Sequence, residues 1–236
     1  MSNINSRIAL VITDRETNAQ IKHLGVGLLE LRADLFKKLD PAYIIDQIKQ
    51  RKLLKIPLLL TLRNQKKEGA VKTFSDELKM QIITAALPLV DLIDIELSSP
   101  LLKRVVSDTK RIGKMVIVSS HHLQGMPRDL ESIFKKSKGP IASTSNSRLK
   151  NVKADFVKIA AKANSFDDVM TMLAFTHRHR KLGPITMSLG PWGALSRLVF
   201  LAAGSRYTYT FLNKPTASGQ MDVVTLKSHL KVYYPA

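Results

Sequence analysis

Short apolar runs, many of them rich in β-branched residues, alternate along the chain with segments of amphipathic pattern. The runs predict eight buried strands: RIALVIT (7–13), GLLELRADL (27–35), IPLLLTLR (56–63), LIDIELS (92–98), MVIVSSH (115–121), ADFVKIAA (154–161), ITMSL (185–189) and YTYTFL (207–212). Strands that alternate regularly with helices are typical of βαβ units, which form parallel sheets. The pattern therefore predicts an α/β protein with eight parallel strands.

The segments between the runs repeat apolar residues at three-and-four spacing, which is the helical period. They predict helices over residues 43–54, 75–87, 99–111, 127–136, 165–179, 191–202 and 219–231. Ser165 with Asp168 three positions later forms a capping-box pattern. Asp40 and Ser99 are each followed by proline, the order favoured in a first helical turn. The first crossover, residues 17–25, has the weakest helical pattern.

Eight strand–helix repeats in a chain of 236 residues fit a closed (β/α)8 TIM barrel, because such barrels typically hold about 200–250 residues in one domain. An open, doubly wound sheet is the alternative architecture. No linker or low-complexity segment divides the sequence, so we expect residues 1–236 to form a single domain. The polar segment KGPIASTSNSRLKNV, residues 138–152, is expected to be a surface loop.

Composition narrows the class of protein further. The chain has no cysteine, no apolar run of about 20 residues and no basic-then-apolar start, so we expect a cytoplasmic protein without a membrane span. The formal charge is +18, from 37 basic and 19 acidic residues. No acid occurs in residues 132–154, or between Asp168 and Asp222. A solvated basic surface, nucleic-acid binding and attraction of an anionic substrate each explain such a charge.

Charged and polar side chains gather late in the predicted strands. They are Glu30, Arg32, Asp34, Arg63, Asp94, Glu96, His121 and Lys158. In a (β/α)8 barrel the carboxyl ends of the strands meet around the active site. Desolvating this many charges would cost several kcal/mol each unless they serve a polar pocket. The pattern therefore favours a functional site built from strand ends.

Each of these residues also has a purely structural explanation. Lys158 can pair with Asp94 or Glu96 in a buried salt bridge, and Arg63 can have a structural role of the same kind. His121 can be a hydrogen-bonded histidine at the rim of the barrel. Asp34 is expected to hold Arg32 or a neighbouring turn. Trp192 is expected to be a packing residue, and the run HRHR (177–180) is expected to be a solvated helix end.

Sequence motifs for other chemistries are missing. The chain has no HxH or HExxH pattern, and the adjacent His121 and His122 would point apart on a strand, so no metal site is expected. It also lacks the glycine-rich nucleotide motifs and the GxSxG elbow of serine hydrolases. We therefore expect no cofactor.

Lys158 lies in the middle of an apolar strand, where desolvation favours the neutral and nucleophilic amine. Such an amine attacks a ketone or an aldehyde to form a Schiff base, which acidifies the adjacent carbon. A histidine that titrates near neutrality can remove the proton, and arginines can hold a carboxylate or phosphate. The residues thus point to Schiff-base lyase chemistry on an anionic oxo compound.

Seven motifs, in order along the chain, resemble those of the type I 3-dehydroquinate dehydratases. They are ELRADLF (30–36), TLRNQKKEGA (61–70), DIEL (94–97), VSSHH (118–122), DFVKIA (155–160), ITMSLGPWGALSR (185–197) and TASGQ (216–220). The resemblance covers essentially the whole sequence. It implies dehydration of 3-dehydroquinate to 3-dehydroshikimate in the shikimate pathway, without metal or dissociable cofactor, by an enzyme that is usually a homodimer.

The resemblance also assigns roles to individual residues. It implies that Lys158 forms the imine, that His121 is the general acid and base, and that Glu68 orients His121. The implied substrate ligands are Glu30, Arg32 and Arg63 on the hydroxyl side, Arg197 for the carboxylate, and Thr216 and Gln220 on a closing loop, with Met187 and Tyr209 as pocket residues.

Three features depart from the family pattern. The loop after the third strand has one residue more than expected before Glu68, so this assignment is the least secure of the site. The same loop ends in EGA where EGG is usual, and TASGQ lacks the proline of SAPGQ.

A class I aldolase on a similar barrel and a non-catalytic nucleic-acid-binding protein are the alternative functions. The Arg197 and Gln220 motifs argue against the aldolase.

Overall fold

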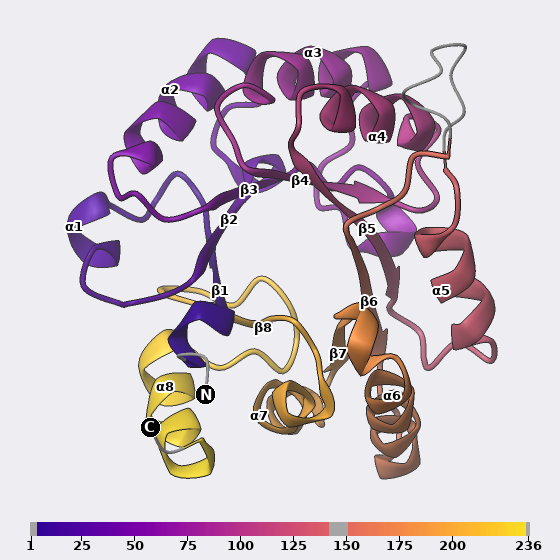
Figure 1. Cartoon of the computed structure of the whole chain (residues 1–236). Coiled ribbons are helices and arrows are strands. Elements are labelled where there is room, and N and C mark those ends of the chain that lie inside the picture. Colours follow the sequence, from indigo (N-terminus) through magenta and orange to yellow (C-terminus); the bar gives the residue numbers. More distant parts are fainter. Residues whose placement is uncertain (1–3, 142–150, 235–236) are drawn as a thin grey trace.

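A computed structural model describes residues 4–141 and 151–234. Eight strands form one parallel sheet that curls around a central axis (Figure 1). The strands are β1 (Ile8–Ile12), β2 (Leu28–Arg32), β3 (Leu58–Thr61), β4 (Leu92–Glu96), β5 (Met115–His122), β6 (Phe156–Lys162), β7 (Ile185–Leu189) and β8 (Thr208–Phe211). All eight predicted strands are present, and the (β/α)8 barrel is confirmed. The middle of the expected loop over residues 138–152 lies outside the described residues.

The ring of strands is nearly closed. The order of pairing is β7-β6-β5-β4-β3-β2-β1-β8, and no ladder joins β7 to β8 among the described residues. Near the starts of these two strands, the Arg206 amide donates to the Pro184 carbonyl at 2.7 Å, and the amide of Thr186 on β7 donates to Ser205 Oγ at 3.1 Å. The seam between β7 and β8 is thus bridged by single hydrogen bonds rather than by a ladder.

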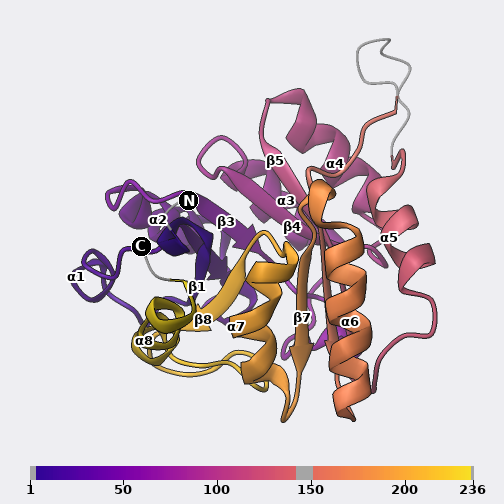
Figure 2. The same cartoon turned by 60° about the horizontal axis from the view of Figure 1, so that its bottom comes forward.

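Helices form the outer layer of the barrel (Figures 1 and 2). They are α1 (Asn18–Ile21), α2 (Pro41–Lys52), α3 (Asp76–Ala86), α4 (Leu102–Arg111), α5 (Leu130–Lys138), α6 (Phe166–Arg178), α7 (Gly193–Ala203) and α8 (Val223–Tyr233). The expected caps at Asp40 and Ser165 are confirmed, since each side chain accepts a hydrogen bond from a backbone amide of the first turn. The expected start at Ser99 is wrong: α4 begins at Leu102, and Ser99 Oγ caps a turn by accepting from the Leu101 amide.

Apolar side chains form one layer inside the ring of strands and another outside it, because side chains alternate between the two faces of each strand. On β6, Val157, Ile159 and Ala161 pack outward against helices α5 and α6, whereas Ala160 belongs to the cluster inside the barrel. That inner cluster also contains Leu28, Leu59, Leu92, Ile117 and Ile185 from five other strands. Towards the carboxyl ends of β2, β5 and β6 the inner positions include polar residues, whereas Val11 on β1 and Met187 on β7 keep part of the wall apolar. The site is built from these positions.

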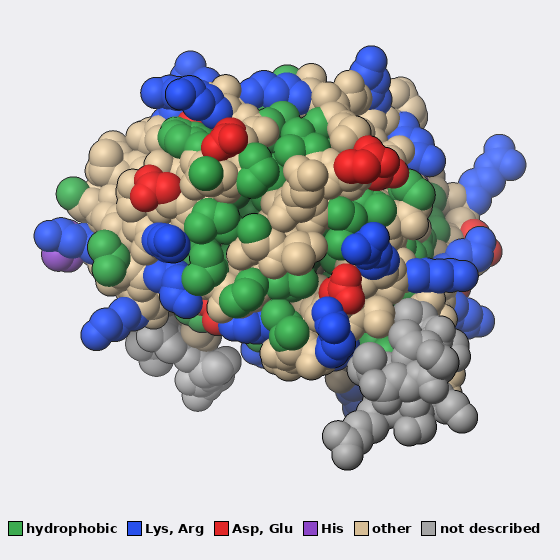
Figure 3. All heavy atoms as spheres, turned by 90° about the horizontal axis from the view of Figure 1, so that it is seen from above, with side chains coloured by type: hydrophobic (Ala, Val, Ile, Leu, Met, Phe, Trp, Pro, Cys, Tyr) green, Lys and Arg blue, Asp and Glu red, His purple; other side chains and the backbone are tan. Residues whose placement is uncertain are grey.

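On the face of the molecule that Figure 3 shows from above, Lys and Arg side chains are spread around the outline and do not gather in one patch. None of the described helices is long and apolar enough to cross a membrane.

Candidate active site

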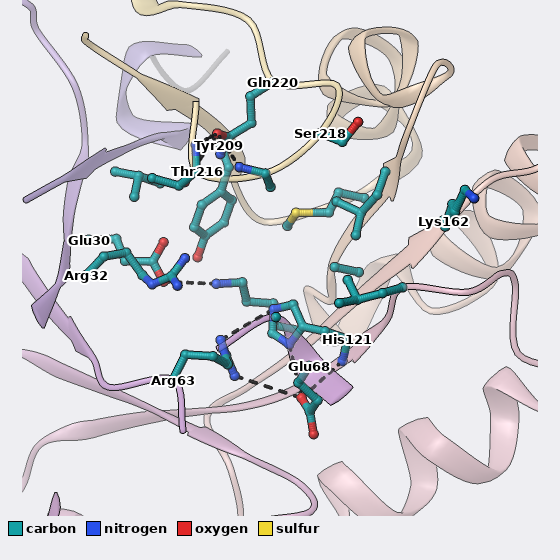
Figure 4. Close-up of a pocket in the computed structure, with 18 of the residues that line it drawn as sticks. Glu30, Arg32, Arg63, Glu68, His121, Lys162, Tyr209, Thr216, Ser218 and Gln220 are labelled. Atoms are coloured by element: carbon teal, nitrogen blue, oxygen red, sulfur yellow. Dashed lines mark hydrogen bonds and ion pairs between the residues drawn. The ribbon is translucent and has the colours of Figure 1, made fainter. Parts of the chain in front are cut away.

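A cavity of about 310 Å³ lies at the carboxyl ends of the strands (Figure 4). Ten of the eleven residues that the sequence analysis assigned to the site line this cavity. They are Glu30, Arg32, Arg63, Glu68, His121, Lys158, Met187, Tyr209, Thr216 and Gln220. Strand ends far apart in the sequence are therefore brought together, as the barrel architecture requires.

Lys158 is buried at the base of this group. Its Nζ donates to Glu30 Oε1 at 3.0 Å and to Asp94 Oδ2 at 3.4 Å, and it lies 4.3 Å from the centre of the Tyr209 ring. The expected pairing with Asp94 is confirmed, but pairing with Glu96 is wrong: that carboxylate binds Lys79 on α3 at 2.6 Å. Glu30 also accepts from Thr61 Oγ1 at 2.7 Å, so its carboxylate is fixed from two sides.

Arg63 joins the carboxylates to the histidine. Its guanidinium donates to Ser119 Oγ at 2.9 Å and to Asp94 Oδ1 at 3.2 Å, and its Nη2 lies 3.4 Å from His121 Nε2. Burial alone would lower the pKa of Arg63, but Asp94 and Glu96 raise it above its ordinary value. The guanidinium is therefore a permanent positive charge on the cavity wall.

His121 contacts Glu68 through its other ring nitrogen. His121 Nδ1 and the His121 amide both lie 3.2 Å from Glu68 Oε2. An ionised carboxylate only accepts, so this contact assigns the proton to Nδ1 and leaves the Nε2 lone pair facing Arg63. Burial, followed by the charges of Arg63, Lys158 and Arg32, lowers the pKa of His121 well below its ordinary value. The imidazole is therefore neutral at pH 7 and able to accept a proton.

The loop after β3 brings Glu68 to this position through a short turn. Residues Lys66–Glu68 form a 3-10 turn, η3, which is closed by the Gly69 amide donating to the Lys66 carbonyl at 3.0 Å. Gly69 has φ +89°, a left-handed conformation that glycine adopts without strain. Glu68 is buried by this turn whereas Lys67 remains exposed. The turn directs the glutamate inward.

Arg32 and Asp34 form a closed pair beside the cavity. Arg32 Nε and Nη2 donate to the two oxygens of Asp34 at 2.9 and 2.8 Å. The expectation that Asp34 holds Arg32 is therefore confirmed. Because both carboxylate oxygens are engaged, Arg32 is held in one orientation, with its remaining donors available at the cavity wall.

The segment after β8 covers one side of the cavity. Gln220 Oε1 accepts from the Thr216 amide at 2.7 Å and from the Ala217 amide at 3.1 Å, which folds residues 216–220 into a compact loop. Gly219, at φ +78°, lies against the turn after β7, where an added Cβ would come within 2.5 Å of the Gly190 carbonyl oxygen and 2.6 Å of Gly193 Cα. This contact between backbones holds the loop against the turn after β7.

Arg197 is the predicted site residue that the structure does not bring to the cavity lining. It is buried on α7, where Nη1 donates to the backbone carbonyls of Ser188 and Gly193. Its Nε and Nη2 are buried without a hydrogen-bond partner in the described structure. Burial lowers the pKa of Arg197 to about 10, so the group is still charged at neutral pH.

Sequence reasoning missed two residues that the structure places at the site. Lys162 lines the cavity at its outer edge (Figure 4). Its position two strand periods after Lys158 was the available signal, since residues i and i+4 of a strand share a face. Ser98, just after β4, donates from Oγ to Glu68 Oε1 at 2.5 Å, and no sequence motif marks it.

Comparison with known proteins gives a consistent result. The model of the family described as Type I 3-dehydroquinase matches residues 8–235. A 3-dehydroquinate dehydratase from Hydrogenobaculum sp. is 30% identical over 230 residues, covering 97% of this chain and 99% of the relative. One from Klebsiella pneumoniae subsp. pneumoniae is 31% identical, covering 88% of this chain and 83% of the relative.

Solved structures agree with the sequence relatives. The 3-dehydroquinate dehydratase from Aquifex aeolicus superposes with a TM-score of 0.78 at 27% identity, covering 97% of this chain and 99% of the other. A type I 3-dehydroquinate dehydratase from Clostridium difficile, whose structure is described as carrying covalently modified comenic acid, has a TM-score of 0.78 at 26% identity, covering 96% and 91% of the two chains.

Proposed function

We propose that this chain, which belongs to the type I 3-dehydroquinase family and is a hydro-lyase acting on 3-dehydroquinate, works through a Schiff base on Lys158. The observation that carries the proposal is the position of Lys158. It is a buried amine that lines the cavity together with a neutral histidine, and the histidine contacts a carboxylate. Nucleophile, base and orienting group are the three parts that covalent carbonyl chemistry needs.

The first stage forms the imine. The ammonium of Lys158 loses a proton to a base in the cavity, and the free Nζ attacks the substrate ketone to form a carbinolamine. Protonation of the carbinolamine hydroxyl releases water and leaves an iminium cation. The Tyr209 ring, 4.3 Å from Nζ, offers its negative face to that cation, while Glu30 and Asp94 supply negative charge on other sides.

The second stage is the elimination. The iminium withdraws electrons from the neighbouring carbon, and His121 Nε2 removes a proton from that carbon to give an enamine. Collapse of the enamine expels the hydroxyl group at the next carbon, and the proton now on His121 converts that leaving group to water. A water molecule then hydrolyses the iminium and frees Lys158. Since one water is consumed and two are released, the net change is loss of one water.

Glu68 keeps His121 ready for both transfers. Its carboxylate accepts from Nδ1–H and thereby holds the tautomer in which Nε2 is the base. When His121 takes the proton, Glu68 stabilises the imidazolium that forms. The low pKa of His121, caused by burial and neighbouring cations, makes the protonated ring a ready donor to the leaving hydroxyl.

The polar side chains of the cavity wall orient the substrate. We assign the substrate hydroxyls to Glu30, Arg32 and Arg63, which line the cavity; Glu30 contacts Lys158 directly. We assign the carboxylate to Arg197, whose Nε and Nη2 are buried without a partner; its side chain has to turn toward the cavity, because it does not reach the lining in this structure. Thr216 and Gln220 close over the substrate, and Met187 completes the wall. These assignments follow the family resemblance.

We also propose that the enzyme is a cytoplasmic homodimer that needs no metal or dissociable cofactor. Within the described residues, no three His, Cys, Asp or Glu side chains come together in a way that could hold a metal ion. Light scattering on the purified protein tests the dimer, and turnover after exhaustive chelation tests independence from metal.

Borohydride trapping tests the mechanism. The protein is incubated with 3-dehydroquinate and reduced, and the modified peptide is identified by mass spectrometry while the absorbance of the enone product is followed in parallel. We expect a reduced adduct on Lys158. His121→Ala should still give the adduct but should produce enone more slowly, by about 100-fold to 10,000-fold, because the proton transfers lack their base. Enone formation without an adduct would refute the Schiff base while leaving the dehydratase activity standing.

A further inference from the structure

We propose that Ser98 is a positioning residue for the elimination, because its hydroxyl holds Glu68 in the orientation that places Oε2 against His121. The inference rests on the proposed role of His121 as acid and base. It concerns a residue that touches neither the substrate nor the reacting atoms. Ser98 Oγ donates to Glu68 Oε1 at 2.5 Å, while His121 occupies the other oxygen, Oε2.

The backbone gives Ser98 a fixed position. The preceding residue continues the β4–β5 pairing, since the Leu97 amide donates to the Ser119 carbonyl at 2.8 Å. The Ser99 amide donates to the Glu96 carbonyl at 3.0 Å and closes a turn that contains Ser98. Ser98 is therefore attached to the barrel itself, whereas Glu68 lies on a loop between β3 and α3. A residue on the rigid element can set the position of one on the loop.

The loop itself holds Glu68 through a single 3-10 turn. Glu68 is the last residue of that turn, so the turn positions its backbone and the hydrogen bonds to its carboxylate position the side chain. Each oxygen has its own side-chain partner: Ser98 on Oε1 and His121 on Oε2. Arg63 Nη1 is 3.9 Å from Oε2, too far for a hydrogen bond.

Ser98 and Glu68 both border a second cavity. This cavity, of about 720 Å³, lies on the other side of the Glu68–His121 pair and is lined by both residues as well as by Ser98 and His122. Ser98 is exposed there, whereas Glu68 is buried. Loss of the hydroxyl would let water replace it at Oε1, and a mobile water fixes the carboxylate less well.

The charges around Glu68 give the sign of the pH effect. Burial raises the pKa of Glu68, the Ser98 hydrogen bond and Arg63 lower it, and Glu96 and Asp94 raise it. Neutral His121 contributes no charge until it is protonated. Removing the Ser98 hydroxyl leaves the raising influences less opposed, so Glu68 becomes protonated at a higher pH. A protonated Glu68 no longer holds the His121 tautomer, and activity is lost earlier on acidification.

The test compares the pH profile of kcat in the parent and in Ser98→Ala. We expect the acid limb to move up by about half a pH unit and kcat on the plateau to fall about threefold to tenfold. Ser98→Thr retains a hydroxyl and should return the limb to its parental position. Ser99→Ala is the matched control, because the Ser99 hydroxyl caps the Leu101 amide and makes no contact with Glu68 in the described structure. It should leave the profile unchanged.

Two further measurements separate positioning from a general loss of stability. In a Glu68→Gln background, Ser98→Ala should change kcat less than about twofold, because the two changes act through one interaction. An NMR titration of the Glu68 carboxyl carbon should show a higher midpoint in Ser98→Ala, and this readout needs no turnover. An unmoved midpoint and acid limb, or an equal loss of kcat in both backgrounds, would overturn the role of Ser98. Absence of enone or adduct in the parent would count against the Schiff-base dehydratase instead.

Discussion

Two buried lysines contact carboxylates that stand two residues apart on β4, yet their surroundings differ. Lys79, from α3, binds Glu96 at 2.6 Å, and both side chains are 1% exposed. Lys158, from β6, contacts Asp94 at 3.4 Å and Glu30 at 3.0 Å, and its side chain is 5% exposed. Burial and pairing with an acid therefore describe a structural lysine and a proposed nucleophile equally well.

The two amines differ in whether they face the cavity and in which side chains lie near them. Lys158 lines a cavity wide enough for a small substrate and shares it with His121, whereas Lys79 is absent from that lining. Its partner Glu96 also accepts from the Asn64 amide at 2.9 Å, which anchors the start of the β3–α3 loop, and it lies 3.9 Å from Arg63 Nη1. A buried lysine is thus a catalytic candidate when its amine faces a cavity that also contains a base.

Replacing Lys158 should have the largest effect on activity. Lys158→Met removes the nucleophile, so we expect turnover of 3-dehydroquinate to fall more than about 1000-fold. The fold should survive, because Glu30 keeps its bond from Thr61 and Asp94 keeps those from Ser119 and Arg63. Initial rates of enone formation measure the first effect, and urea unfolding measures the second. Near-parental turnover in a folded Lys158→Met would contradict the assignment.

Replacing Lys79 should have the opposite profile. Lys79→Met removes the cation that Glu96 binds directly and leaves only Arg63, at 3.9 Å, near this buried carboxylate, so we expect the unfolding free energy to fall by about 3 kcal/mol. We expect kcat to change less than about tenfold, since the catalytic groups are untouched. Urea unfolding and initial rates on the same preparation provide both numbers.

A double variant sharpens this second prediction. Lys79→Met combined with Glu96→Gln removes the unpaired charge as well, so it should be more stable than Lys79→Met alone. If the double variant were less stable than Lys79→Met, the loss of stability in Lys79→Met would not come from the unpaired Glu96 carboxylate. If Lys158→Met were the more destabilising of the two lysine changes, the contrast between the lysines would fail.

The barrel could be predicted from the sequence because its signal is repeated. Each strand is an apolar run, each helix has its own period, and β7 was predicted residue for residue at Ile185–Leu189. The start of α4 was predicted wrongly because Pro100 permits a first helical turn without requiring one. The open seam between β7 and β8 was not predictable, since it depends on the register of strands distant in sequence.

Some residues of the site could be predicted from the sequence, and others could not. Lys158 and His121 were recognisable because a charged or titratable residue late in an apolar strand needs an explanation. Glu68 was the least secure assignment, since spacing alone could not show that η3 would turn it inward. Ser98 could not be predicted from the sequence, because a serine after a strand is common and only the folded structure brings it into contact with Glu68. The position of Arg197, facing backbone carbonyls beside the cavity, likewise depends on packing of α7.

Lys162 provides the smallest and most specific test of how the site uses its charge. It lines the cavity four residues after Lys158, and its amine makes no hydrogen bond or ion pair with any other described residue, so its positive charge is free to act on an incoming anion. One charge at about 4 Å in water is worth about 1 kcal/mol, so Lys162→Met should lower kcat/KM about fivefold at low salt. The difference from the parent should shrink as added sodium chloride screens the charge. Lys181→Met, an equal loss of charge at an exposed residue ahead of β7, should leave kcat/KM within about twofold of the parent, and an equal loss in both variants would assign the effect to net charge rather than to Lys162.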